Sequence, residues 1–501
     1  MAEMLKRRYD LSALKIRLLA DADPPSVRCE LELTREHVPE PVANWQLPAT
    51  ELGLPPVLDC AQSHGSGYEF RLPAAIAAEL ADAVREAAAP ERPLWLHLVR
   101  PFGHLGLVPW EQLLAPVLPV PVLRLPDFVV EPVRSRRAVT VALCADDGPG
   151  DLREQADLVG RLAAAIVGAV PLPTTLHIFP TAALYELLRH AKSPVDRADR
   201  VLLHDPAGAA AAAQAIGGTQ SDERYLGANR APLYAASTDS SVGQHRNAWL
   251  TWMRDALCGQ GVDVVHFLAG AVLRLDQGAL TLSENPADPA DTGLSVVSTA
   301  ALTRFLLQVG AWGCGFTSPP GNPSEMGLRL VATTIADLRP TTLLHHEARL
   351  DPQLRALADG YRLMTSPEPT LPPDGGGAVF VYCQPFQVAT EPGRDERAGA
   401  AAAAPGTAPS DKVRELLTDA PATPTWVSAS QRFVEQYEWR LHQWRDDQPV
   451  PPELSDGVAK ALELIQGVVD RYAEAPAVEH ESAPTPVVDL SDAPPDPEVP
   501  R

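Results

Sequence analysis

Cysteine and histidine are the residues of this chain with the widest chemical scope. The six cysteines are far apart, without a Cys-x-x-Cys pair or another short spacing: Cys29, Cys60, Cys144, Cys258, Cys314 and Cys383. Disulfide frameworks and zinc clusters need characteristic short spacings, so this pattern favours neither of them. We therefore expect free thiols in a reducing cytosol. A free thiol becomes a nucleophile when a positioned base lowers its pKa, as in cysteine peptidases.

The run His345-His346-Glu347 could suggest a metal site. Neighbouring residues of a strand point to opposite faces of a sheet, so these two imidazoles cannot easily bind one ion. With Asp351 nearby, the run fits a polar site at the carboxyl edge of an α/β sheet, where ligands of such sheets bind. The chain has no GxGxxG and no GxxxxGK[ST] phosphate loop. We expect neither a metal nor a cofactor.

Short apolar strands that alternate with helices must position these groups. Strands are predicted at 94–99, 138–144, 174–179, 262–268, 341–345 and 377–382, and helices at 152–166, 181–191 and 299–308. This order is typical of an α/β fold with a mostly parallel sheet flanked by helices. Residues 1–90 add two alternating strands, at 15–19 and 27–33, and an amphipathic helix at 74–88, which together predict an α+β lead-in.

Composition limits the class of protein. With 45% hydrophobic residues, the chain can bury a sizeable core. The formal net charge of −22 argues against binding to nucleic acid or to an anionic membrane, because both need a basic surface. No apolar run approaches the length of a membrane helix, and Lys15 and Arg17 interrupt any signal-like segment. We expect a cytoplasmic protein.

The C-terminal fifth of the chain has a different composition. Residues 391–425 are rich in Ala, Pro, Gly and Thr and are predicted to be a disordered linker. Residues 426–475 carry two apolar stripes at helical spacing, which predict a helical hairpin. Two helices alone bury little surface, so the hairpin should pack on the main domain or on a protein partner. Residues 476–501 are rich in Pro and acids and are predicted to be disordered.

Three segments, in a fixed order, carry a resemblance to a known family. Residues 94–114 read LWLHLVRPFGHLGLVPWEQLL, residues 262–282 read VDVVHFLAGAVLRLDQGALTL, and residues 302–350 contain Cys314 before the helical run Gly327-Leu-Arg-Leu-Val-Ala332. In this order they resemble CHAT domains, caspase-like α/β domains found mostly in bacteria. The resemblance implies a caspase-like domain over residues 91–390.

The resemblance also assigns possible catalytic positions. CHAT domains have a strand ending in His-Phe-x-x-His-Gly, whose second His is the general base. Here His266 is present with its Phe, but Gly270 stands at the position of the base. The family's nucleophilic Cys ends the following strand, and Cys314 is the candidate for it. A shifted register puts Ser318 or Pro319 at the strand end instead.

Two functions are compatible with these residues. In the first, the chain is a catalytically degenerate CHAT-like module that binds a protein partner in a bacterial conflict or signalling system, with the hairpin at 426–475 as a candidate contact. In the alternative, it is an active cysteine endopeptidase that uses Cys314 with His266 or another histidine as base. Gly270 favours the first function, because a base at that position would need an imidazole.

The domain boundaries can be tested directly. Limited proteolysis should cut first inside residues 393–425, because exposed small and polar residues are preferred cleavage sites. Mass spectrometry of the first fragments locates the cut. Early cleavage inside the α/β body, with residues 393–425 still intact, would show that the linker is placed wrongly.

Overall fold

The computed structural model describes most of residues 5–389 and the short segment 487–489. Its larger gaps are residues 55–67, 128–137, 191–199 and 211–246. The predicted linker at 391–425 and the predicted hairpin at 426–475 lie outside the described residues, as does the tail at 476–501 except for 487–489.

The centre of the fold is a parallel sheet. Its strands, in spatial order, are β8 (Arg200–His204), β7 (Thr174–Pro180), β6 (Val139–Ala145), β9 (Val264–Leu268), β13 (Gly313–Ser318), β14 (Thr342–Glu347) and β15 (Val379–Tyr382). Neighbouring strands from β8 to β14 run parallel, and β15 joins β14 in the antiparallel direction. The strands are buried over most of their length, as expected for a sheet covered on both faces. The predicted α/β class with a mostly parallel sheet is confirmed.

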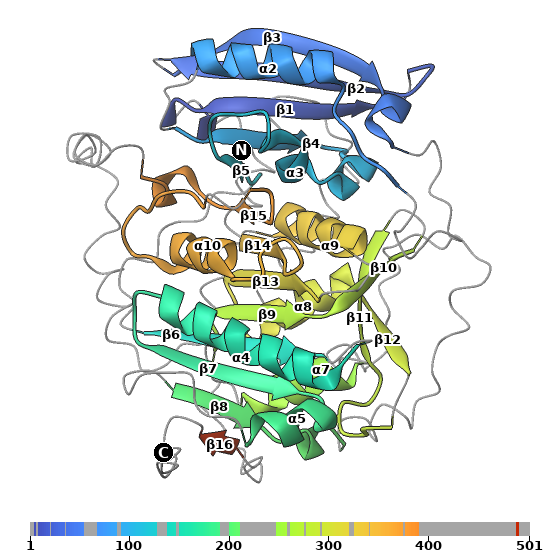
Figure 1. Cartoon of the computed structure of the whole chain (residues 1–501), viewed down its shortest axis with the longest axis vertical. Coiled ribbons are helices and arrows are strands. Elements are labelled where there is room, and N and C mark those ends of the chain that lie inside the picture. Colours follow the sequence, from blue (N-terminus) through green and yellow to red (C-terminus); the bar gives the residue numbers. More distant parts are fainter. Residues whose placement is uncertain are drawn as a thin grey trace, which may run out of the picture.

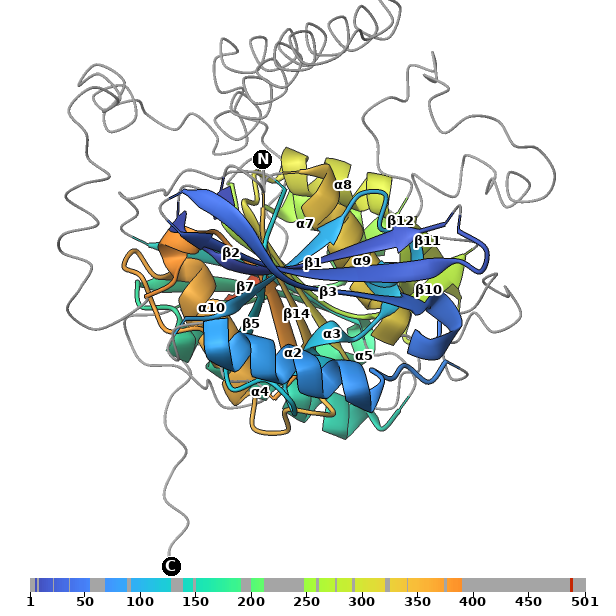
Figure 2. The same ribbon diagram turned by 90° about the horizontal axis from the view of Figure 1, so that it is seen from above.

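Helices cover both faces of this central sheet (Figure 2). One face is covered by α4 (Leu152–Ala169), α5 (Ala182–Leu188) and α10 (Arg355–Thr365). The other face is covered by α7 (Ala248–Ala256), α8 (Thr299–Gln308) and α9 (Glu325–Leu338). Each face therefore has its own apolar core. None of the described helices is both long and apolar enough to cross a membrane.

A second group of strands extends the sheet beyond β15 (Figure 1). In spatial order it contains β5 (Val122–Arg124), β4 (Leu94–Val99), β1 (Ser12–Leu19), β2 (Ser26–Arg35) and β3 (Val38–Pro48). The helices of this part are α2 (Ala74–Ala87), α3 (Trp110–Leu114) and the 3-10 turns η1 (Ala49–Leu52) and η3 (Gly103–Leu107). Because β1 pairs in parallel with β4, the sheet continues without a break across the boundary expected near residue 90.

Sequence patterns did not predict the outermost strand, β3. It contains Pro39 and Pro41, and proline weakens the prediction of a strand because it lacks the N–H that a ladder needs. The strand forms nevertheless because it lies at the edge of the sheet, where β2 is its only partner within the described part of the chain. An edge strand can leave one side unpaired, so proline is tolerated there.

A small antiparallel sheet stands beside the main one. It consists of β10 (Gly270–Arg274), β11 (Gln277–Ser283) and β12 (Leu294–Ser298). It packs on α9 through two glycines that approach closely. A Cβ at Gly278 would lie 2.6 Å from the carbonyl oxygen of Gly327, and one at Gly327 would lie 3.0 Å from the Cβ of Ala271. Larger side chains at either glycine would push the hairpin away from the helix.

One short contact joins the two groups of strands. Strands β15 and β5 share a single register pair, Tyr382 with Arg124. Arg124 is fully buried and donates to both carboxylate oxygens of Glu111, at 2.7 and 2.9 Å. It also donates to the hydroxyl of Thr333 on α9 at 3.0 Å, and its guanidinium carbon lies 3.6 Å from the centre of the Phe380 ring. These contacts link the two groups of strands at the boundary between β15 and β5, which we call the seam. They compensate for the short ladder of backbone hydrogen bonds there.

The tail differs from its prediction at one place. Residues Val487–Asp489 form β16, which pairs in the antiparallel direction with β8 and completes a 13-stranded sheet among the described residues. A pattern search cannot find such a strand, because three residues carry no periodicity that distinguishes a strand from a coil.

The contribution of the Arg124 cluster to the stability of the fold can be tested by removing one charge. Glu111→Gln preserves the side-chain volume but leaves the buried Arg124 without its counter-ion, so we expect a loss of about 3–5 kcal/mol in the free energy of unfolding. The exposed pair Arg161–Asp157 offers the control, since Asp157→Asn should cost less than about 1 kcal/mol. Denaturant titration measures both variants. Equal losses of unfolding free energy in Glu111→Gln and Asp157→Asn would show that the Arg124 cluster does not stabilise the seam.

Candidate functional site

The polar residues that the sequence singled out gather near the carboxyl ends of β9, β13 and β14. These strands are neighbours and run parallel, so their last residues, Leu268, Ser318 and Glu347, reach the same edge of the sheet. This is the edge at which open α/β sheets bind ligands.

His266 lies inside β9, four residues before Gly270, and is fully buried. Both ring nitrogens are engaged: Nδ1 is 2.8 Å from the hydroxyl of Tyr361, and Nε2 is 2.8 Å from that of Thr317. Gly315 makes room for the ring, because a Cβ at that position would overlap it. Burial lowers the pKa of His266 to about 3, and repulsion from His346 adds to the shift. The imidazole is therefore neutral at physiological pH and has no contact with solvent.

The hydrogen bonds of His266 continue towards the surface. Thr317 Oγ1 lies 3.2 Å from Nδ1 of His346, and Nε2 of His346 lies 3.4 Å from a carboxylate oxygen of Asp351. Asp351 also accepts hydrogen bonds from the amides of Arg355 and Leu357 at the start of α10. Burial opposes ionisation of Asp351, but its hydrogen bonds to His346 and to these amides more than compensate and lower its pKa. This series of contacts, from His266 to Asp351, thus links the start of α10 to the sheet.

Cys314 lies on the neighbouring strand but on the opposite face. In the register of β13 and β9, Gly315 is paired with His266, so the preceding residue points to the other side of the sheet. Cys314 belongs to the core under α8 and α9, with Val265 and Leu343, and is fully buried. Burial raises the pKa of its thiol, which the charge of Arg339 opposes only in part. The structure therefore does not bring the two candidate catalytic residues together.

The other positions named by the family resemblance carry no imidazole or thiol. Gly270 opens β10 just beyond the end of β9 and is paired with Thr281. Ser318, rather than Cys314, is the last residue of β13, and Pro319 follows it. The Ser318 hydroxyl is buried and has no hydrogen-bond partner in the part of the chain that the structure describes. No nucleophile is thus positioned by a base at this strand end.

His345 and His346 point to opposite faces of β14, as expected for consecutive strand residues. The ring of His345 stacks on Phe380, with the ring centres 4.7 Å apart. Its Nε2 atom has no hydrogen-bond partner among the described residues, so it is not paired with Ser318. Burial holds the pKa of His345 well below its usual value, and the charge of Arg329 acts in the same direction. Within the described residues, no group of three or more His, Cys, Asp or Glu side chains could hold a metal ion.

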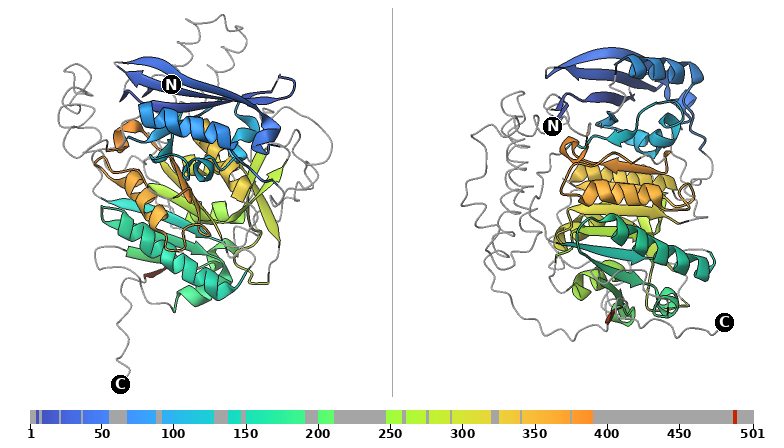
Figure 3. Two further views of the ribbon diagram at one scale, coloured as in Figure 1. Left: turned by 45° about the horizontal axis from the view of Figure 1, so that its top comes forward. Right: turned by 60° about the vertical axis from the view of Figure 1, so that its left-hand side comes forward.

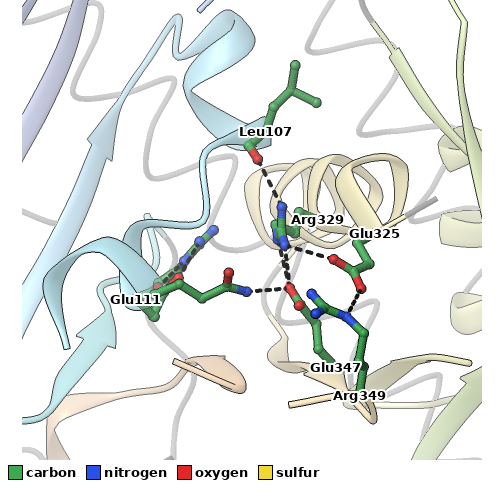
Figure 4. A network of polar contacts seen from close by, with 8 residues as sticks. Leu107, Glu111, Glu325, Arg329, Glu347 and Arg349 are labelled. Carbon is green, nitrogen blue, oxygen red and sulfur yellow. Dashed lines mark hydrogen bonds and ion pairs between the residues drawn. The ribbon is translucent and has the colours of Figure 1, made fainter. Parts of the chain in front are cut away.

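The sequence patterns did not predict the buried ion pair at this edge, between Arg329 and Glu347 (Figure 4). Arg329 Nε donates to Glu347 Oε1 at 3.0 Å, and Gln112 donates to the same oxygen at 2.8 Å. Burial raises the pKa of Glu347, with Arg329 opposing the shift and Glu325 adding to it. An available signal was the single charge that Arg329 places inside the otherwise apolar run of residues 327–332. The pair ties α9 and β14 to α3.

The buried imidazole of His266 predicts a pH dependence of stability. Its pKa is lowered from 6.5 to about 3 on folding, so the unfolded chain takes up the proton first as the pH falls. The stability from this neutral group is complete above about pH 6.5 and is lost towards pH 3. His266→Gln should therefore reduce the slope of unfolding free energy against pH by about 1.4 kcal/mol per pH unit between about pH 6 and 4.

Denaturant titrations at several pH values measure this slope. The readout is the slope and not the stability itself, because His266→Gln also removes two hydrogen bonds. His190, which is exposed, provides the matched control as His190→Gln, with an unchanged slope expected. An identical slope in His266→Gln and the wild type would mean that His266 is not held neutral by the fold.

Comparisons with known proteins give no match: no family model fits the chain, and no curated protein and no solved structure matches it. The fold and the geometry of the strand ends are therefore the observations from which a function can be inferred.

Proposed function

We propose that the chain is a caspase-like module of CHAT type that has lost its Cys–His dyad and acts by binding a protein partner. The observation that carries this proposal is that Cys314 and His266 lie on opposite faces of the sheet. A peptidase dyad needs its thiol and imidazole within hydrogen-bond reach of each other, and a sheet between them prevents this.

Several features support the likeness to CHAT domains. The three segments that carry the resemblance lie together around one sheet: β4 and α3, then β9 with the hairpin of β10 and β11, then β13, α9 and β14. The glycines of the second and third segments, Gly278 and Gly327, allow the hairpin and α9 to touch. The strand that should end in the nucleophile lies directly beside the strand that precedes the base position.

That first strand ends at Ser318, and Gly270 stands at the base position that the resemblance implies. Glycine cannot transfer a proton, and general acid–base help is typically worth about 10² to 10⁴ in rate. Cys314 cannot replace the missing nucleophile, because its raised pKa leaves even less thiolate than the few per cent of an ordinary thiol at neutral pH. The alternative, an active cysteine endopeptidase, therefore lacks both an ionised thiol and a base beside it.

A module without this chemistry can still act by recognition. The apolar stripes expected at 426–475, which lie outside the described residues, make that segment the first candidate for contact with a protein. A role in a bacterial conflict or signalling system follows from the family resemblance. The acidic composition favours protein over nucleic acid or anionic lipid as the partner.

Thiol labelling and peptide digestion test the loss of the dyad. We expect an alkylating reagent at neutral pH to label Cys314 no faster than Cys144 and Cys383, which are equally buried. A peptide library should show no cleavage that differs between the wild type, Cys314→Ala and Ser318→Ala, with or without candidate partner proteins. Mass spectrometry reads both assays.

Two results would contradict the proposed loss of the dyad. Fast, selective labelling of Cys314, together with cleavage that disappears in Cys314→Ala, would replace the binding proposal with the endopeptidase. Cleavage that disappears only in Ser318→Ala would point to a serine nucleophile and would also overturn it.

A further inference from the structure

Four cationic side chains are buried in the part of the chain that the structure describes: Lys6, Arg124, Arg329 and Arg339. The first three have carboxylate partners, which are Glu32, Glu111 and Glu347. Arg339 is only 3% exposed, and it forms no ion pair within the described residues. Buried charges are normally paired, because an unpaired ion loses its hydration without compensation. Arg339 therefore differs from the other buried cations.

The guanidinium of Arg339 has donors to spare. Arg339 lies between the end of α9 at Leu338 and the start of β14 at Thr342. Its Nη2 atom donates to the carbonyl oxygen of Ala311, which lies just before β13. Its Nε and Nη1 atoms are buried and have no hydrogen-bond partner among the described residues. Because a carbonyl oxygen is neutral, the one hydrogen bond does not balance the charge.

The groups beside Arg339 do not supply a counter-ion. Cys314 is the titratable group whose charge would act on the guanidinium, but burial raises the pKa of this thiol, so it is protonated at neutral pH. Asp337, two residues before Arg339, forms an ion pair with Arg100. Burial lowers the pKa of Arg339 to about 10, so the guanidinium is still charged at neutral pH. The charge thus needs a partner from outside the described chain.

We propose that Arg339 binds a small oxyanion, in the form of a carboxylate or a phosphate group, at the amino ends of β13 and β14. The inference goes beyond the proposed function and does not rest on it, because Glu347 and the other candidate residues lie at or towards the opposite end of these strands. A guanidinium binds oxyanions through charge-assisted hydrogen bonds, for which Nε and Nη1 are the donors here. The anion would neutralise the charge that lies between α9 and the sheet.

The position of Arg339 limits the size of the ligand. Both views of Figure 3 show the yellow and orange part of the chain, which includes α9, β13 and β14, between the blue N-terminal strands and the green part of the molecule. Leu338 is 41% exposed, so the chain reaches the surface one residue before the site. The formal net charge of −22 repels a ligand in proportion to its own negative charge, which disfavours polyanions. A small anion is therefore the class that fits.

Denaturant titration of the full chain tests this site. The probes are inorganic phosphate and acetate, with sodium chloride added to keep the ionic strength constant, because salt screens charges in general. We expect one or both probes to lower the unfolding constant of the wild type, by about 100-fold when the anion reaches about 100 times its Kd. Arg339→Met should show no such response, because it keeps a side chain of similar length without the charge. The matched control is Arg304→Met on α8, where the arginine is exposed, and it should respond like the wild type.

The same titrations in sodium chloride alone show whether Arg339→Met folds. Replacement of a buried charge by an apolar side chain of similar volume is often neutral or stabilising. We therefore expect Arg339→Met to be at least as stable as the wild type without the probes. Added phosphate or acetate should then stabilise the wild type and leave the variant unchanged.

NMR spectra of the arginine Nε–Hε groups locate the bound anion. The signal of Arg339 is identified by its absence from the spectrum of Arg339→Met, and the signal of Arg304 is identified in the same way. We expect the Arg339 signal to shift saturably as the stabilising probe is added, because its Nε atom becomes a donor to the anion. The Arg304 signal should not shift.

Three results would overturn the proposal. The first is that neither probe stabilises the wild type more than sodium chloride does. The second is an equal response in the wild type and Arg339→Met, which would show a general salt effect. The third is stabilisation without a shift of the Arg339 signal, which would place the anion elsewhere. Stabilisation by one probe alone would support the proposal and show whether the site takes a phosphate or a carboxylate.

Discussion

The fold depends on one buried guanidinium. Arg124 is the last residue of the three-residue strand β5 and shares with Tyr382 the only register pair, among the described residues, between the N-terminal strands and the central sheet. One register pair provides few backbone hydrogen bonds between the two halves of the sheet. The apolar cores beside the seam nevertheless stay buried only if the two halves remain in contact. The bidentate contact with Glu111 and the stacking on Phe380 neutralise a charge that would otherwise be very costly to bury.

The ion pair of Arg329 and Glu347 lies at the carboxyl edge of the sheet, where open α/β sheets bind ligands. Glu347 is bound from one side by α9 and from the other by Gln112 of α3, a part of the N-terminal half. The hydrogen bond between Gln112 and Glu347 is thus a second contact across the seam, in addition to the contacts of Arg124 with Thr333 and Phe380. The carboxyl edge of the sheet thus joins two parts of the molecule through the contacts of Glu347 with Arg329 and Gln112.

The candidate catalytic residues show that the alternation of side chains along a strand decides which groups can meet on one face of the sheet. A shift of one residue along β13 changes the face to which a side chain points. Gly315 and Thr317 face His266 and accommodate it, whereas Cys314 faces the core under α8 and α9. On one face the imidazole is neutral and fully hydrogen-bonded, and on the other the thiol is protonated. Each residue packs into its own layer, and both side chains are fully buried.

Periodicity in the sequence was sufficient to predict the α/β class and many elements, including β4 at 94–99 and α8 at 299–308. These elements have strong local patterns, and local patterns decide whether a segment becomes a strand or a helix. The strands that hold His266 and Cys314 are neighbours in the sheet. The short strands β5 and β16 and the proline-containing β3 carry too weak a pattern to be predicted, and they form because a neighbouring strand is there to pair with them.

Which face each candidate residue occupies, and which ion pairs close the seam, depended on register and on contacts between segments more than 200 residues apart, such as Arg124 with Thr333. Only the tertiary structure could decide these points, because strand register and hydrogen bonds between distant segments are properties of the packed chain and are not encoded in local periodicity.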